Sequence, residues 1–267
     1  MALSQFATVT IALRAARTMD AMKHLHGAAR NRSLLAFGTL LVLLASCAAS
    51  VPAPRAAAPP DVEAVRRALV EYHDSGAYER ELAAVTREAQ AYLALRAAAV
   101  TKPAAVFDID ETSLSNWPEM AANQFAQFAP DLPCDLTRTG WPCGHVQWQL
   151  KAQDAPIQPV LELYRAARAL GVAVFFITGR RDDVDGRMRR ATGANLRAAG
   201  FAEWAALVMK PAALQVRSAA DYKAPARKQI EDAGYTILIT IGDQDSDLAG
   251  GYAERAFKLP NPFYFIP

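Results

Sequence analysis

Three apolar runs, each followed by a polar residue, constrain the fold of this 267-residue chain more than any other feature. They are AAVF at 104–107, VAVFFI at 172–177 and YTILITI at 235–241. Short apolar runs bounded by turn residues are typical of buried strands. Segments with helical periodicity separate the three runs. Strands that alternate with helices predict an α/β fold with a parallel sheet.

The ends of these predicted strands carry the side chains of chemical interest. Asp108, Thr178 and Asp243 lie at or just beyond the three ends. The carboxyl ends of parallel strands meet at one edge of a sheet, which is where open α/β proteins place their sites. We therefore expect these three residues to converge. Helices are predicted at 159–170, 182–199 and 221–233, and shorter strands at 206–208 and 256–259.

A helical lead-in precedes the first strand. Apolar residues at spacings of three and four predict a helix from about 62 to 73, which Asp61 can cap. Ser75-Gly76 interrupts the pattern, which resumes from about 78 to 96. We expect both apolar stripes to face the core, over the sheet or the mouth of the site. A coiled coil with a partner is the alternative.

The N-terminus is typical of an export signal. The apolar stretch 34–46 follows Lys23, Arg30 and Arg32, and it is too short for a comfortable membrane-spanning helix. It ends in Leu-Ala-Ser-Cys at 44–47, which resembles a bacterial lipobox. The resemblance implies that Cys47 is lipidated and becomes the mature N-terminus, anchoring the exported protein to a membrane, expected to be the outer one. A plain signal peptide or an uncleaved anchor is the alternative.

The expected domain organisation follows from this signal. Residues 1–46 form the signal peptide, whose true start can be Met22, and 47–60 form an Ala/Pro tether. Residues 61–267 form the folded domain. Without 1–46 the chain keeps 24 basic and 26 acidic residues, a net charge of −2. A net negative charge does not favour binding to the phosphates of nucleic acid, and we expect no nucleic-acid partner.

A long insertion, about 113–155, follows the first strand and is expected to form a small cap over the site. Its aromatic residues can stack on an aromatic leaving group such as a nucleobase, or they can fill the core of the cap itself. Export places Cys134 and Cys143 in an oxidising compartment, so a disulfide is expected. His145 can serve as an acid or make a polar loop contact. The aromatic residues are Trp117, Phe125, Phe128, Trp141 and Trp148.

Asp108 and Asp110 share one side of an extended segment, because side chains alternate along a strand. Together with Asp243 they make a site of hard oxygen ligands, which suits Mg²⁺ bound to few carboxylates, several waters and a substrate phosphate. Thr178 and the amides around Gly179 can donate hydrogen bonds to phosphate oxygens. Lys223, in the first turn of a predicted helix, can neutralise charge. This set favours phosphoryl transfer, with an Asp nucleophile and an aspartyl-phosphate.

The motifs DIDET, ITGR, the Lys223 helix and GDQDSD resemble the four motifs of the haloacid-dehalogenase (HAD) superfamily of phosphatases. Within it, YKAPARKQI, IGDQDSDLAG and FKLPNPFYFIP resemble the class B-type acid phosphatases, a branch with bacterial acid phosphatase lipoproteins and plant vegetative storage proteins. The resemblance covers roughly residues 61–267. It implies a HAD-like Rossmannoid parallel sheet flanked by helices.

The resemblance also implies roles. Asp108 would be the nucleophile and a metal ligand, and Asp110 the general acid and base, with its backbone carbonyl on the metal. Thr178 would bind phosphate with Gly179, and Lys223 would hold the phosphoryl group, with Lys210 as a rival. Asp243 would ligate Mg²⁺, and Asp247 would assist through a bound water. Asp182 and Asp245 are expected to be solvated or capping residues.

The predicted function is a Mg²⁺-dependent acid phosphatase that acts on small phosphomonoesters. A 5′-nucleotidase is the narrower alternative, suggested by the aromatic insertion. A surface or storage protein that keeps the fold without turnover is the non-catalytic alternative, although this chain retains Asp108. A receiver-type phosphorylation switch fits poorly, because export removes the chain from cytoplasmic kinases.

Overall fold

The computed structural model describes residues 58–138 and 140–267. Its centre is a parallel sheet in the order β5-β4-β1-β6-β7. The three long predicted strands occupy its middle, because they are apolar enough to be covered on both faces. The strands are β1 (Pro103–Phe107), β4 (Ala173–Asp182), β5 (Ala206–Pro211), β6 (Thr236–Gly242) and β7 (Arg255–Lys258). This confirms the predicted α/β fold.

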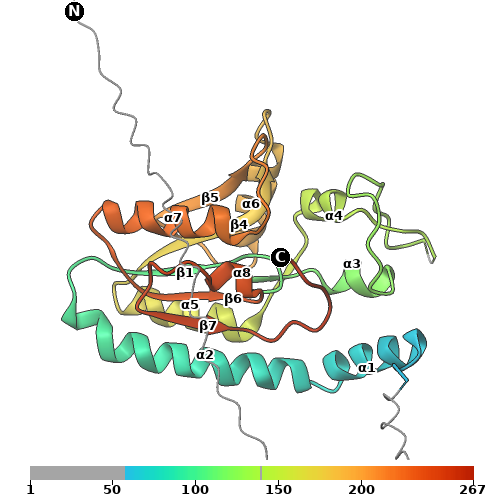
Figure 1. Ribbon diagram of the computed structural model, residues 1–267, viewed down its shortest axis with the longest axis horizontal. Helices are drawn as coiled ribbons and strands as arrows, with labels where there is room; N and C mark the ends of the chain where they lie inside the picture. The colour runs from blue at the N-terminus through green and yellow to red at the C-terminus, as the bar shows by residue number, and fades with distance from the viewer. Residues whose placement is uncertain (1–57, 139) are drawn as a thin grey trace, which may run out of the picture. The chain divides into compact units, whose positions relative to one another are not determined.

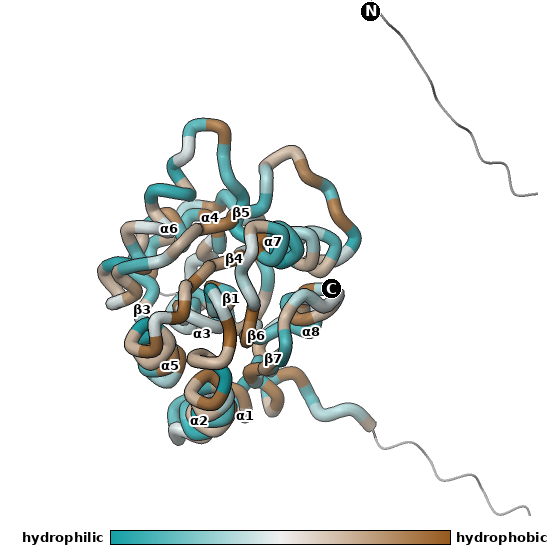
Figure 2. Tube along the Cα trace, turned by 90° about the vertical axis from the view of Figure 1, so that its left-hand side faces the viewer, coloured by the Kyte–Doolittle hydropathy of each residue, from teal (hydrophilic) through white to brown (hydrophobic). Residues whose placement is uncertain are grey.

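Helices cover both faces of the sheet (Figure 1). On one face α2 (Ala77–Arg96) and α5 (Gln158–Ala169) pack over alternate strand residues such as Phe107 and Phe176. On the other face α7 (Ala220–Asp232) packs over Val106 and Ile177. The alternation follows from the two-residue repeat of a strand. Figure 2 shows the strand order with α7 on one side and α5 and α2 on the other.

The helical lead-in forms as predicted, but its first half contributes only partly buried residues to the core. Asp61 caps α1 (Val62–Asp74), since its Oδ1 accepts the amide of Ala64 at 2.7 Å. No residue of α1 is buried, and Val62 keeps 66% of its surface exposed. The predicted core-facing stripe is confirmed only in part for α1, because Leu69 is partly buried and packs against the core while Val62 and Val65 stay exposed. It is correct for α2, which buries Tyr78, Leu82, Thr86, Ala89 and Leu93.

One predicted boundary is also wrong. The helix expected from 182 begins only at Arg187, as α6 (Arg187–Ala198). Residues 178–182 instead continue β4, and Arg181 and Asp182 pair with β5. Gly186, at φ 68°, supplies the left-handed turn that starts the helix. The longer strand carries Arg180 and Arg181 beyond the body of the sheet.

The segment after β1 contains β2 (Leu114–Ser115), α3 (Trp117–Ala122), α4 (His145–Lys151) and β3 (Ala155–Pro156), with β2 and β3 antiparallel. The remaining elements are the 3₁₀ turn η1 (Ala97–Ala99) and α8 (Asp245–Leu248). No helix within the described ranges is both long and apolar enough to cross a bilayer. The predicted signal peptide, its possible start at Met22 and the lipidation site Cys47 lie outside the described residues.

Candidate active site

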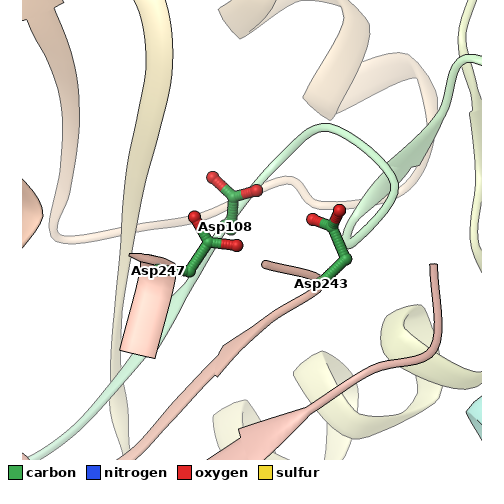
Figure 3. Close-up of side chains that lie close together, drawn as sticks. All are labelled: Asp108, Asp243 and Asp247. Carbon is green, nitrogen blue, oxygen red and sulfur yellow. The ribbon is translucent and has the colours of Figure 1, made fainter. Parts of the chain in front are cut away.

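Three carboxylates meet at the carboxyl edge of the sheet (Figure 3). Asp108 follows β1, Asp243 follows β6, and Asp247 lies on α8. One oxygen of each lies within 4.8 Å of the others, and all three side chains are buried. We call these three residues the acidic cluster. The predicted convergence of Asp108 and Asp243 is observed, and Asp247 joins them with its own carboxylate.

The short helix α8 brings Asp247 into the acidic cluster. Its Oδ2 accepts the backbone amide of Gln244, and the Gln244 side chain caps the same helix in return. Gly242 makes this turn possible: a Cβ there would lie 2.5 Å from the Cβ of Asp247. Any side chain at 242 would push Asp247 away. The glycine before Asp243 thus has a local structural reason.

Lys223 supplies the positive charge of the cluster. From α7 its Nζ donates to Asp108 Oδ1 at 2.5 Å and to Asp247 Oδ1 at 2.6 Å. Burial acts to lower the pKa of Lys223, but the two carboxylates outweigh it and the pKa rises. The lysine is therefore a fixed cation at neutral pH. Lys210, its rival in the sequence, lies on β5 and makes no ion pair with the cluster.

One lysine does not balance three buried carboxylates. Burial, followed by the charge of Asp247, raises the pKa of Asp243 to about 6. Burial and the neighbouring carboxylates also raise the pKa of Asp108. Thr112, Gln244 and Asn261 donate to Asp243, which holds its oxygens in place without adding charge. A hard divalent cation fits this donor set, because it supplies the missing charge to carboxylate oxygens.

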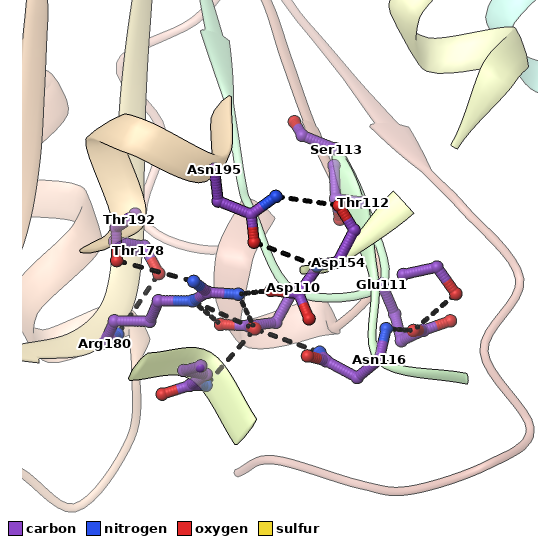
Figure 4. A network of polar contacts seen from close by, with 12 residues as sticks. Asp110, Glu111, Thr112, Ser113, Asn116, Asp154, Thr178, Arg180, Thr192 and Asn195 are labelled. Carbon is purple, nitrogen blue, oxygen red and sulfur yellow. Dashed lines mark hydrogen bonds and ion pairs between the residues drawn. The ribbon is translucent and has the colours of Figure 1, made fainter. Parts of the chain in front are cut away.

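The side chain of Asp110 points into a different environment (Figure 4). Arg180 donates to it through Nε, at 3.1 and 3.2 Å, and through Nη2 at 2.8 Å. Asn116 and Gln149 donate to the same carboxylate. Burial acts to raise the pKa of Asp110, but Arg180 and the hydrogen bond from Asn116 lower it overall. The side chain of Asp110 is therefore a stabilised carboxylate outside the acidic cluster.

Arg180 is a residue that the sequence reasoning missed. Its side chain has no exposed surface, and its Nη2 also donates to Asp154 at 2.9 Å. The amide of Asn195 on α6 fixes Asp154 through two backbone hydrogen bonds. One indication of Arg180 was present in the sequence. It follows Thr178 by two residues in a strand, so the two side chains lie on the same side of the strand.

The predicted phosphate-binding residues are placed differently from each other. Thr178 is fully buried, and its Oγ1 accepts the backbone amide of Arg180 at 3.1 Å. Gly179 lines the open cavity beside Asp108 and Asp110. A Cβ at 179 would meet nothing within 4 Å, so packing does not require glycine there. Direct contact between phosphate and Thr178 remains a prediction.

Glu111 is a second buried group that was not anticipated. Its carboxylate accepts from Tyr78 of α2 at 3.0 Å and from the amide of Asn116 at 2.5 Å. Burial is the main reason that its pKa rises to about 8. Its φ of 48° turns the chain sharply after Asp110. This contact ties the helical lead-in to the loop that carries both predicted catalytic acids.

The cluster opens into a cavity of about 910 Å³. The segment 113–155 contributes Phe125 and Phe128 to its wall, and α4 contributes His145. Burial lowers the pKa of His145, so the imidazole is neutral near pH 7. A cavity of this size accommodates a small organic molecule rather than a bare inorganic ion.

The aromatic residues of the segment divide between the two predicted uses. Trp117 and Phe125 pack on Phe263 of the C-terminal segment, with ring centroids 5.3 and 5.9 Å from it. Trp148 packs on the Cys134–Cys143 disulfide, which the structure forms as expected. Trp141 is exposed beneath Arg138. Only Phe125 and Phe128 line the cavity.

The chain is similar to several plant proteins. It is 33% identical over 163 residues to acid phosphatase 1 of Solanum lycopersicum, covering 60% of this chain and 58% of that one. It is 36% identical over 166 residues to a stem 31 kDa glycoprotein of Glycine max, covering 60% and 59%. Vegetative storage protein 1 of Arabidopsis thaliana is 31% identical over 163 residues, covering 61% and 55%. The match thus spans less than two thirds of these curated relatives.

Among solved structures, the fold resembles the class C acid phosphatase of Bacillus anthracis, solved with tungstate bound. The TM-score is 0.59 at 21% identity, covering 76% of this chain and 86% of that one. This likeness concerns the fold. The sequence profile of the HAD superfamily, subfamily IIIB (acid phosphatase), matches residues 40–267. The resemblance seen in the motifs is therefore confirmed, and the chain belongs to HAD subfamily IIIB, a family of acid phosphatases.

Proposed function

We propose that this protein is a Mg²⁺-dependent acid phosphatase that hydrolyses small phosphomonoesters through an aspartyl-phosphate. The observation that carries the proposal is the acidic cluster bridged by Lys223 beside a cavity. A carboxylate repels a phosphate dianion, so it can act as a nucleophile only where positive charge is concentrated. The family membership supports the same reaction.

In the first step, an oxygen of Asp108 attacks phosphorus and the ester P–O bond breaks. The departing oxygen takes a proton from Asp110. Lys223 already bonds Asp108 Oδ1, so its ammonium lies where the charge of the transferred group develops. Asp108, Asp243 and the backbone carbonyl of Asp110 would hold Mg²⁺, and Asp247 would assist through water or directly. The bound ion would lower the charge repulsion between nucleophile and phosphate.

In the second step, Asp110 takes a proton from water, the water oxygen attacks phosphorus, and the P–O bond to Asp108 breaks to release inorganic phosphate. Arg180 lowers the pKa of Asp110 and so favours the deprotonated form that this step requires. The protonated form needed in the first step becomes more populated as the pH falls. We therefore expect the rate to rise toward acid pH.

The test is a panel of phosphomonoesters assayed with Mg²⁺ and with a chelator. We expect phosphate release from an aryl phosphate with Mg²⁺ and its loss with chelator. No release with any divalent cation would instead support a non-catalytic role, such as that named for the vegetative storage relatives. Full activity in chelator would contradict the proposed role of the acidic cluster.

A nucleotidase is the second candidate, favoured by the two phenylalanines on the cavity wall. Phe125 and Phe128 both line it, and an aromatic face stacks on a nucleobase. The measurement is kcat/KM for AMP against glycerol phosphate. A clear preference for AMP that falls in a Phe128→Ala variant supports base stacking. Equal values for the two substrates would remove it.

We also propose that the protein is exported and anchored by lipid at Cys47. The export signal in the sequence supports this, and so does the Cys134–Cys143 disulfide, which is stable in oxidising compartments. Several acyl chains on one cysteine would anchor the protein stably. Labelled fatty acid should mark the wild-type protein and not a Cys47→Ser variant. An unlabelled wild-type protein would contradict the anchor.

A further inference from the structure

We propose that the cavity has a second anion subsite, formed by Arg181, Lys210 and Arg217, and that the physiological substrate carries a second anionic group at its far end. The inference rests on the proposed function for the first anion, the phosphoryl group at Lys223. All three cations line the same cavity as the acidic cluster. The substrate class is therefore a phosphomonoester with a second phosphate or a carboxylate.

The fold brings these three cations to one wall. Arg181 and Lys210 are register partners on the extended ends of β4 and β5, so their side chains leave the sheet on the same side. The loop after β5 carries Arg217 and leads into α7, which bears Lys223. Figure 2 shows the loops that project beyond β5, one of them leading toward α7. The wall thus continues from the lysine of the reactive end to the three cations.

The three cations have no carboxylate partner among the described residues. Arg187 lines the same cavity but pairs with Asp185 at 2.7 Å and lies 4.0 Å from Asp183. The oxygens of Asp183 also accept the amide of Met188. Asp131, a further acid on the cavity, belongs to the insertion rather than to this wall. The positive charge of Arg181, Lys210 and Arg217 is therefore left for a ligand.

A second observation points to a ligand on this wall. Tyr222, next to Lys223, lines the cavity and is only 8% exposed. Its hydroxyl is buried and has no hydrogen-bond partner in the described chain. A buried hydroxyl without a partner is costly, so native structures normally satisfy it. An anionic oxygen of the substrate would accept a hydrogen bond from it.

The dimensions agree with a substrate longer than a simple phosphate ester. The cavity of about 910 Å³ lies near the upper end of the range for small-molecule pockets, roughly 300–1,000 Å³. One end is built for the phosphoryl group and one wall holds Phe125 and Phe128. The remaining polar wall is cationic. A neutral substrate body would leave that charge without a partner.

The test uses ω-carboxyalkyl phosphates of increasing chain length, each paired with its neutral terminal amide. The leaving oxygen is the same in both, so the ratio of kcat/KM reports only the far end. We expect the carboxylate to be preferred by about tenfold at the best length, since a hydrogen bond to a charged group contributes roughly 1.5–3 kcal/mol. Added salt should reduce the ratio, because these side chains are partly exposed.

Variants then assign the effect. Arg181→Ala, Lys210→Ala and Arg217→Ala should each lower the ratio, and the triple variant should bring it near one while the amide substrates keep their rates. Tyr222→Phe should lower it without opening a cavity. Arg187→Ala is the matched control on the same wall and should preserve the preference. A wild-type ratio of one at every length, or a triple variant that keeps the preference, would overturn the subsite.

A binding measurement separates this inference from the proposed function. In an Asp108→Asn protein, calorimetry with the same pairs should show the carboxylate binding about tenfold tighter than the amide. This ratio of affinities does not depend on turnover. A wild-type protein without turnover would defeat the proposed reaction, while the calorimetric ratio would still decide the subsite.

Discussion

Asp108 and Asp110 are separated by one residue, yet they lie in opposite electrostatic environments. Asp108 shares Lys223 with Asp247 and faces Asp243, so its neighbourhood is short of positive charge. Asp110 is surrounded by donors, chief among them the buried guanidinium of Arg180. In the proposed function a cation and a phosphate complete the first environment, whereas protein side chains alone neutralise the charge of Asp110 in the second. One motif thus places two carboxylates in different surroundings, as the proposed roles of nucleophile and acid–base group require.

The largest expected effect lies on the Asp108 side of this comparison. Asp108→Asn should lower kcat by a factor on the order of 10⁴–10⁶, as loss of a catalytic nucleophile does. Burial raises the pKa of Asp108, so a neutral amide should leave the fold intact by circular dichroism. Asp245→Asn is the matched control, an exposed acid at the start of α8, two residues before Asp247. Equal losses of activity in the two variants would contradict the distinction.

Substitution of Arg180 tests the environment of Asp110. Arg180→Met leaves the carboxylates of Asp110 and Asp154 buried without their shared cation, and we expect a loss of about 3–5 kcal/mol in the free energy of unfolding. Urea denaturation measures it. Arg181→Met, at the exposed neighbour, should change stability by less than about 0.5 kcal/mol. Adding Asp154→Asn to Arg180→Met should recover part of the loss.

The charge shortage of the acidic cluster predicts a pH-dependent effect of metal removal. Burial raises the pKa of Asp243 from 3.8 to about 6 in the folded protein. A raised carboxyl pKa favours folding below the unfolded pKa, and that contribution is lost as the pH rises through about 6. Chelated protein should therefore lose on the order of 2–3 kcal/mol of stability between pH 4 and 7, at about 1.4 kcal/mol per pKa unit.

Mg²⁺ should restore that loss at pH 7 and have little effect at pH 4, where Asp243 is protonated. Thermal denaturation with Mg²⁺ and with chelator, repeated across this pH range, gives two curves of stability against pH. In Asp243→Asn the two curves should lie closer together. Curves that run parallel in the wild-type protein would show that the acidic cluster does not bind the ion.

The smallest effect concerns the periphery of the Asp110 environment. Gln149 on α4 donates to Asp110 Oδ1 over a long 3.3 Å, while Arg180 and Asn116 remain in place without it. Gln149→Leu should cost about 1 kcal/mol or less in stability and about threefold or less in kcat. Denaturation and steady-state assays measure both. A loss as large as that of Arg180→Met would mean that the insertion, rather than Arg180, holds Asp110.

Much of this architecture could be predicted from residue patterns. The apolar runs before Asp108, Thr178 and Asp243 specify central parallel strands, and this placed two members of the acidic cluster correctly. The course of β4 to Asp182 could not be predicted, because its pairing with β5 overrides the polar and glycine residues that suggested a turn. The exposure of Val62 and Val65 at the start of α1 was missed for a similar reason, since periodicity indicates a helix but not what covers it.

The electrostatic pairings were also beyond the sequence. Arg180 and Asp110 are 70 residues apart, and no local pattern joins them. The side chain of Asp247 enters the cluster because α8 turns sharply over Gly242, a geometry that spacing alone does not give. Contacts between residues that are far apart in the sequence become visible only in the three-dimensional structure.

The most direct measurement of the central claim is to trap the phosphorylated protein. Acid quenching during turnover, followed by borohydride reduction, converts an aspartyl-phosphate to homoserine, which peptide mass spectrometry locates. We predict the modification at Asp108, dependent on Mg²⁺ and absent from Asp110. Turnover with no modified residue, or with the modification at any other residue, would contradict the account.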